Sequence, residues 1–349
     1  MSNALVAPET RDLSELSTIL TRWLAARQPQ ASDLTVTNLN YPRGAGQSHE
    51  TILLDASWTE HGTAKTQGYV VRIQPKNFTV FLDDLFEQQF HVMQALHEQG
   101  RVRVAKTFWL ERDPSLLGAK FFIMEKLSGR VPISMPPYSQ TGWVADATPQ
   151  QRRHLWESGV HQLAAIQSAP LEKFRFLEGP AQARDGLEQE FDKYRRTVAW
   201  LQQDRPWPVL EEALARLRDL WPHHSPPGLV WGDARLGNIM FDDHFDAVAV
   251  MDWEQPSLGG ALNDLGWWLV VSESLHGANE TRPHLEGMGT RSETIALWET
   301  LTGKSAQDIE WFEDFARLKM SCCKIRMDAL RKQAPPDEKW LAKRLKVAK

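Results

Sequence analysis

The chain has 349 residues, which exceeds the usual size of a single hydrophobic core and predicts two lobes. Lys and Arg number 40 against 45 Asp and Glu, and the net charge of −5 argues against nucleic acid and against an anionic membrane surface as main partners. The two cysteines are neighbours, which disfavours a disulfide, and no signal peptide or long apolar run is present, so we expect a soluble cytoplasmic protein.

The first part of the chain predicts a small β-rich lobe. An amphipathic helix is expected over 11–27, and apolar and β-branched runs separated by turn residues predict strands. A second helix over 83–99 is predicted from its apolar stripe, which ends at a glycine. The expected strands cover 34–42, 50–58, 68–75, 104–112 and 119–127. The order of three strands, one helix and two strands indicates a five-stranded antiparallel sheet.

The amino-acid composition changes after residue 127, where a segment rich in Pro, Ser and Gly indicates a lobe boundary. We therefore expect one domain over 1–127 and a larger, mostly helical domain over 128–349. Between its helices lies one β-rich stretch, in which 238–241 and 247–251 flank a polar turn. These patterns predict an α+β fold with two lobes, an architecture that resembles that of the protein kinases. Helical periodicity is found over 150–168, 184–204, 208–221, 292–302 and 307–331.

The strongest motif is Gly-Asp-Ala-Arg-Leu-Gly-Asn at 232–238, followed by Met-Asp-Trp-Glu at 251–254. It comes directly after a strand-like run and precedes the hairpin. These residues resemble the motifs of the aminoglycoside phosphotransferase and choline kinase-like family, and most closely those of the phosphotransferase domains associated with acyl-CoA dehydrogenases. The resemblance implies an enzyme that uses ATP and Mg²⁺ to phosphorylate a hydroxyl group of a small molecule.

The resemblance assigns a role to each polar residue of the two motifs. Asp233 would accept or orient the proton of the attacking hydroxyl, and Arg235 would neutralise the transferred phosphoryl group. Asn238 and Asp252 would bind magnesium, and Glu254 is a further candidate ligand for magnesium or water. Hard oxygen ligands favour magnesium over zinc. The alternatives are that the Asp and Asn side chains only form turns or caps and that the arginine is solvated.

The loop before the second strand is the candidate for covering the phosphates. Gly44, Gly46, Gln47 and Ser48 resemble a stretch that the family has there, although two glycines between strands also suit an ordinary hairpin. Arg72 interrupts an apolar strand where kinases carry a phosphate-binding Lys, and an exposed strand arginine is the alternative.

Two further nucleotide contacts follow from the resemblance. The helix glutamate of the family falls at Gln89, a departure, so Glu87 is the nearest acid that could pair with Arg72. The adenine would rest on a hinge formed by the main chain of Glu125 and Leu127.

The second lobe offers hints about the acceptor. Asp264 would brace the catalytic segment, and Trp231 replaces the usual His before Gly-Asp. Tryptophans at 267, 268, 298 and 311, without an acidic cluster, favour an acceptor with an apolar or aromatic body, or a hydroxyacyl-CoA, over a polycation. A true aminoglycoside kinase and a nucleotide-binding pseudokinase are the alternatives, and both a monomer and a homodimer are open.

Overall fold

The computed structural model describes residues 11–42, 49–75, 79–178, 186–276 and 283–347. They form two compact units, Met1–Thr79 with Ala105–Leu127 and Val80–Val104 with Ser128–Lys349. The first unit ends at Leu127, and residues 80–104 group with the second unit. Within that unit, Asp83 accepts two hydrogen bonds from Arg196 and the Arg103 carbonyl accepts one from the Val250 N–H.

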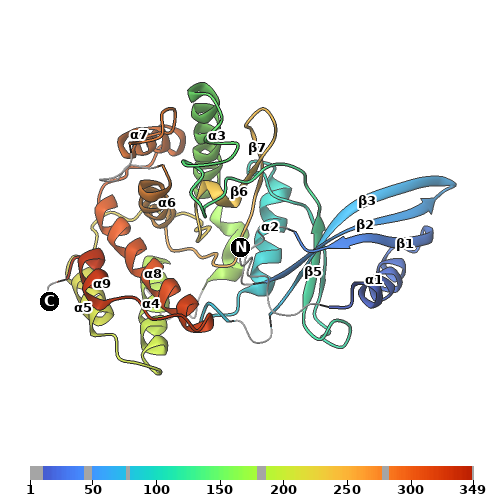
Figure 1. Ribbon diagram of the computed structural model, residues 1–349, viewed down its shortest axis with the longest axis horizontal. Helices are drawn as coiled ribbons and strands as arrows, with labels where there is room; N and C mark the ends of the chain where they lie inside the picture. Colours follow the sequence, from blue (N-terminus) through green and yellow to red (C-terminus); the bar gives the residue numbers. More distant parts are fainter. Residues whose placement is uncertain (1–10, 43–48, 76–78, 179–185, 277–282, 348–349) are drawn as a thin grey trace. The chain divides into compact units, whose positions relative to one another are not determined.

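The first unit is built on a five-stranded sheet with the order β1-β2-β3-β5-β4, antiparallel throughout, as predicted (Figure 1). One helix, α1 (Leu13–Arg27), begins at Asp12, whose carboxylate accepts the N–H groups of two first-turn residues. The strands are β1 (Ala31–Asn40), β2 (Glu50–Glu60), β3 (Thr63–Ile73), β4 (Thr107–Glu111) and β5 (Phe121–Glu125).

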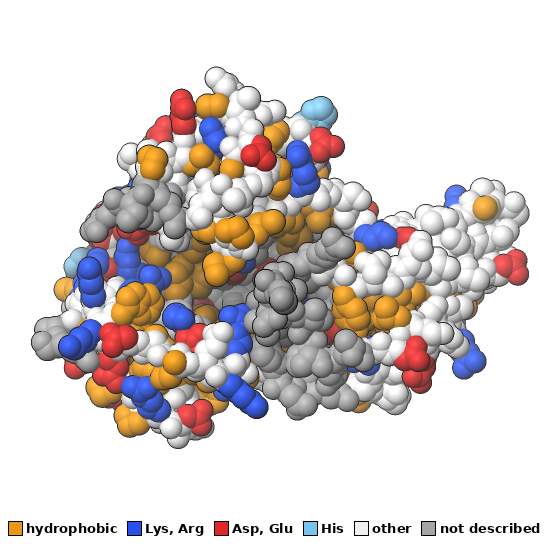
Figure 2. Space-filling model, in the orientation of Figure 1, with side chains coloured by type: hydrophobic (Ala, Val, Ile, Leu, Met, Phe, Trp, Pro, Cys, Tyr) orange, Lys and Arg blue, Asp and Glu red, His pale blue; other side chains and the backbone are white. Residues whose placement is uncertain are grey.

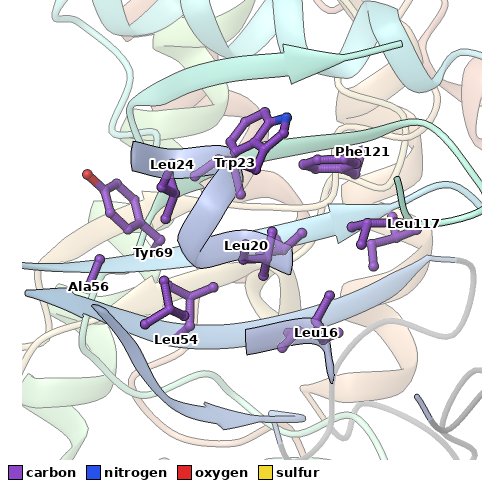
Figure 3. Packing of buried hydrophobic residues seen from close by; sticks show 14 of the residues in the cluster. Leu16, Leu20, Trp23, Leu24, Leu54, Ala56, Tyr69, Leu117 and Phe121 are labelled. Carbon is purple, nitrogen blue, oxygen red and sulfur yellow. The ribbon is translucent and has the colours of Figure 1, made fainter. Parts of the chain in front are cut away.

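The core of the first unit lies between α1 and the sheet. Helical spacing places four buried residues of α1 on one face, and strand alternation supplies their partners from β2 (Figure 3). The face of α1 presents Leu16, Leu20, Trp23 and Leu24. Full burial of one such side chain is worth roughly 1.5–3 kcal/mol, so this face is what holds α1 on the sheet.

The second unit is mostly helical and carries a two-stranded hairpin of β6 (Ile239–Phe241) and β7 (Ala247–Val250). At its centre, α6 (Leu262–Leu275) packs against α8 (Ile309–Leu330), with Gly266 so close to the Phe312 backbone that a Cβ atom would clash. Among the described residues, no helix combines the length and apolar character needed to cross a membrane. The remaining elements are α2 (Phe86–Gln99), α3 (Pro149–Gln167), η1 (Leu171–Leu177), α4 (Gly186–Leu201), α5 (Pro208–Asp219), η2 (Leu236–Asn238), α7 (Arg291–Thr302) and α9 (Glu338–Leu345).

Candidate active site

The 232–238 segment follows a short extended stretch and ends in η2, which is one turn of 3-10 helix. Val230 and Ser257 exchange backbone hydrogen bonds, which fixes the entry to the segment. Gly232 has φ +105°, and a Cβ atom there would lie 2.7 Å from the Gln255 carbonyl oxygen. Only glycine meets both conditions, so this residue sets the direction in which Asp233 leaves the backbone.

Asp233 is held by three side-chain donors. Its Oδ2 atom accepts from Arg235 Nε at 2.9 Å and from Asn238 Nδ2 at 2.7 Å. Its Oδ1 atom accepts from the Trp267 indole N–H at 2.9 Å. The Asp233 side chain is still 34% exposed, so the carboxylate is oriented but remains accessible.

Arg235 is a mostly buried cation beside Asp233. Burial disfavours its charge, but Asp233, which is in contact, and Asp252 outweigh this and raise the pKa of the guanidinium. Arg235 Nη1 also donates to Ser134 Oγ at 2.7 Å, which ties it to the segment after the first unit. Arg235 is therefore held at two of its guanidinium nitrogens, by Asp233 and by Ser134, and its role toward the phosphoryl group stays a prediction.

Asn238 and Asp252 are brought together by the hairpin register. Met251 N donates to Asn238 O at 2.8 Å, which places Asp252 one residue beyond the bonded pair. The Asn238 side chain uses Nδ2 for both its bonds to Asp233, and Oδ1 is the atom that a cation requires. Asp252 has φ +62°, a left-handed conformation that is uncommon outside glycine. It caps no helix, since α6 starts at Leu262.

The oxygen donors of this region fit magnesium. Mg²⁺ is usually bound through one or two carboxylates together with substrate phosphates, and Asn238 and Asp252 would supply an amide oxygen and a carboxylate from neighbouring positions of the hairpin. Glu254 is 6% exposed, nearly as buried as Asn238, and its role as a further ligand stays a prediction. Within the described ranges, no group of three or more His, Cys, Asp or Glu side chains forms a metal cluster.

Asp264 braces the 232–238 segment from the first turn of α6. Its two oxygens accept the backbone N–H groups of Trp231 at 2.6 Å and Gly232 at 2.9 Å. The residue is 1% exposed, and burial raises its pKa to about 6 despite these bonds and the charge of Lys319. At neutral pH the carboxylate is therefore mainly ionised and available to both donors.

Two tryptophans contribute donors that the sequence alone did not reveal. Trp231 is fully buried and donates its indole N–H to Met251 O at 2.8 Å, which joins the segments on either side of the hairpin. Trp267 lies three residues after Asp264 on α6, hence on the same face, and binds Asp233. By contrast, Trp268, Trp298 and Trp311 are buried core residues and not an exposed acceptor lining.

Replacing Asp264 with Ala is expected to lower the free energy of unfolding by about 1–3 kcal/mol for each of the two buried N–H groups left without an acceptor. Asp264→Asn retains one acceptor oxygen and should cost less than Asp264→Ala. Urea denaturation of the three proteins at neutral pH measures the difference. A variant as stable as the wild type would show that other groups hold the segment.

The predicted nucleotide residues are distributed over both units. Gly44, Gly46, Gln47 and Ser48 lie outside the described residues. Arg72 is half-buried on β3, opposite Thr51 of β2 and Phe122 of β5. Glu87 is on α2, in the second unit, so its pairing with Arg72 stays a prediction.

The hinge predicted to bind adenine lies at the end of β5. The Glu125 N–H already donates to Lys106 O at 2.8 Å, so this N–H is not available to a ligand. Leu127 is the last residue of the first unit, at the boundary itself. The roles of Glu125 and Leu127 stay predictions.

A five-stranded antiparallel sheet, together with a helical unit that carries Asp233, Asn238 and Asp252 around a short hairpin, defines a protein-kinase-like fold. The chain belongs to the phosphotransferase enzyme family, whose model matches residues 42–300.

Similar proteins agree with this assignment. A probable acyl-CoA dehydrogenase of Arabidopsis thaliana, IBR3, is 27% identical over 284 residues, which are 77% of this chain but 33% of that protein, so the chain spans a third of its length. A structure from Ralstonia eutropha, provisionally described as an aminoglycoside phosphotransferase, has TM-score 0.66 and 22% identity over 94% of both chains. Aminoglycoside phosphotransferase APH(4)-Ia, solved with ADP and hygromycin B, has TM-score 0.54 and 14% identity over 94% of this chain and 96% of its own.

Proposed function

We propose that this protein is an ATP- and magnesium-dependent kinase that phosphorylates a hydroxyl group of a small molecule. The observation that carries the proposal is the geometry of Asp233, whose carboxylate is accessible and oriented by three N–H donors. Phosphoryl transfer depends on such positioning and on charge stabilisation more than on covalent help from the protein. ATP as the donor is supported by the similar fold of APH(4)-Ia, which was solved with ADP.

The residues of the second unit divide the work of the reaction. Asp233 would hold the acceptor hydroxyl and take its proton, and Arg235 would offset negative charge beside it. Asn238 and Asp252 would hold magnesium, which supplies charge neutralisation for the phosphates. The glycine loop, Arg72 and the hinge keep their predicted roles toward the nucleotide.

The acceptor is proposed to have an apolar or aromatic body, and a hydroxyacyl-CoA remains within that class. On the face that Figure 2 shows, the acidic side chains of the second unit are scattered among basic ones. A site for an aminoglycoside needs a dense acidic lining to bind several positive charges.

The location that we propose is the cytoplasm. The free thiols of Cys322 and Cys323 agree with this reducing compartment.

Release of ADP from Mg²⁺-ATP in the presence of an acceptor panel is the direct test. The panel contains aromatic alcohols, phenols, hydroxyacyl-CoA esters and kanamycin-like aminoglycosides. We expect turnover with an acceptor from the first three classes, because none of these requires an acidic lining. Efficient phosphorylation of aminoglycosides alone would instead identify an antibiotic kinase, and nucleotide binding without turnover of any acceptor would identify a pseudokinase.

A further inference from the structure

A cavity lies in the second unit between α4, α8 and the chain around residues 80–83. Its empty space is about 320 Å³, part of it open to solvent, and its enclosed part has room for about one water molecule. It is therefore a narrow recess suited to one small group of a ligand. The residues that line the recess include Lys193, Tyr194, Trp200, Gln255, Cys323 and Arg326.

The recess is next to the candidate active site. Gln255 lines it and is also the residue whose carbonyl lies against Gly232, directly before Asp233. Cys323 lines the recess from α8. Burial raises the pKa of its thiol to about 12, and the negative charge of Asp233 is the second-largest cause of that increase. The recess therefore lies near the segment that carries Asp233.

Lys193 is the unusual feature of the recess. The residue is 9% exposed, and its Nζ atom has no hydrogen-bond partner among the residues that the structure describes. Burying an ammonium group is costly unless an anion compensates for it. The structure therefore lacks a bonded partner for a cation that faces a cavity.

Two nearby acids also interact with cations other than Lys193. Asp83, an acid in the described wall of the recess, accepts from both terminal nitrogens of Arg196 at 2.9 and 2.8 Å. Against the effect of burial, the charge of Lys193 and then that of Lys319 lower the pKa of Glu190, and Lys319 forms an ion pair with Glu190 at 3.5 Å. Among the described residues, the wall carries two cations, Lys193 and Arg326, and one acid that is already paired.

Apart from Thr197 and Gln255, the other residues in the described wall are apolar or aromatic. Tyr194 and Trp200 of α4 face the recess, and the Arg326 guanidinium lies over the Trp200 ring at 4.5 Å. Such a surface favours an apolar body attached to a single anionic group. It repels a polycation.

We propose that the recess is part of the acceptor site and that Lys193 binds an anionic oxygen group, a carboxylate or a phosphate, of an apolar hydroxylated acceptor. This inference rests on the proposed kinase function and narrows it to an anionic acceptor. The competing use of Lys193 is purely structural, as a second neutralising charge for Glu190, whose Oε2 atom has no hydrogen-bond partner in the described part of the chain either. A structural role affects stability but gives no preference between a charged and an uncharged acceptor.

The test compares wild type with Lys193→Met and with the control Arg195→Met, which removes one positive charge from an exposed position of the same helix. The acceptors are a series of hydroxydecanoates that differ in the position of the hydroxyl group. Each acid is compared with its uncharged methyl ester and with the corresponding hydroxydecyl phosphate. We expect wild type and Arg195→Met to favour an anionic acceptor over its uncharged ester by about 100-fold in kcat/KM. In Lys193→Met, most of this preference for the anionic acceptor should be lost. Whichever of the carboxylates and phosphates has the higher kcat/KM with the wild type identifies the anionic group that the recess binds.

Equal use of acids and esters by the wild type would overturn the inference, and so would an unchanged ratio in Lys193→Met. The wild-type preference requires no variant, and Lys193→Gln is a second substitution should the Met variant not fold. Calorimetric binding of the acids without nucleotide separates this test from that of the kinase. Failure of transfer to every acceptor, esters included, contradicts the kinase, whereas equal binding of acid and ester contradicts the role of Lys193.

Discussion

Asp233→Asn is expected to lower phosphoryl transfer by about 100-fold or more while the affinity for ATP stays within a few fold. The substitution keeps the size of the side chain and one oxygen that can accept from the Trp267 indole. It removes the carboxylate that would take the proton of the acceptor. Steady-state ADP release measures kcat, and calorimetry measures nucleotide binding.

A matched control for this variant is Asp243→Asn, which makes the same change at an exposed position of the hairpin turn, where the side chain is paired only with Arg130 at 3.3 Å. Thermal unfolding of both variants shows whether a loss of activity reflects a loss of structure. Wild-type turnover by Asp233→Asn would remove this residue from the mechanism.

Much of the first unit could be predicted because its pattern is local. Alternation in β2 and helical spacing in α1 each place apolar side chains on a single face, and those faces form the core. The prediction failed at the start of β3, which begins at Thr63 and not at Gly68. A polar two-residue turn, His61-Gly62, has positive φ at both residues and pairs Glu60 with Thr63, so the strand includes polar residues that carry no apolar pattern.

The second unit shows a different limit. Helices with one apolar face, such as α3 and α8, were predicted from their periodicity, but α6 was not assigned as a helix. Residues 262–270 of α6 are all buried, so its apolar residues lie on every side of the helix and show no helical period. The most central helix was therefore the hardest to recognise.

The candidate site was predictable where it is continuous in sequence. Asp233, Arg235 and Asn238 lie in one short segment, and the motif alone brings them together. Ser134 and Trp267 reach the same cluster from distant segments, which only tertiary packing can determine. Lys193 carries no motif at all, because what distinguishes it is burial without a bonded partner among the described residues.

Asp252→Ala is expected to abolish magnesium-dependent nucleotide binding, because Asp252 is the proposed carboxylate ligand and Asn238 contributes only a neutral oxygen. Calorimetric titration with ATP, with and without Mg²⁺, measures the effect, and wild type without Mg²⁺ should behave like the variant. Asp246→Ala is the control, since this carboxylate lies just before β7, is 58% exposed and contacts His154 instead.

Asn238→Ala should weaken the same binding less than Asp252→Ala but should also lower kcat, since Asn238 Nδ2 holds the Asp233 carboxylate at 2.7 Å. The two variants are therefore expected to differ. Asp252→Ala would remove a negative charge from the proposed metal site, whereas Asn238→Ala would remove a neutral ligand and free the Asp233 carboxylate to rotate. Unchanged Mg²⁺-ATP binding by Asp252→Ala would show that the metal is held elsewhere. In that case the left-handed backbone of Asp252 would need another explanation, because α6 begins only at Leu262 and Asp252 directly follows Met251, which pairs with Asn238.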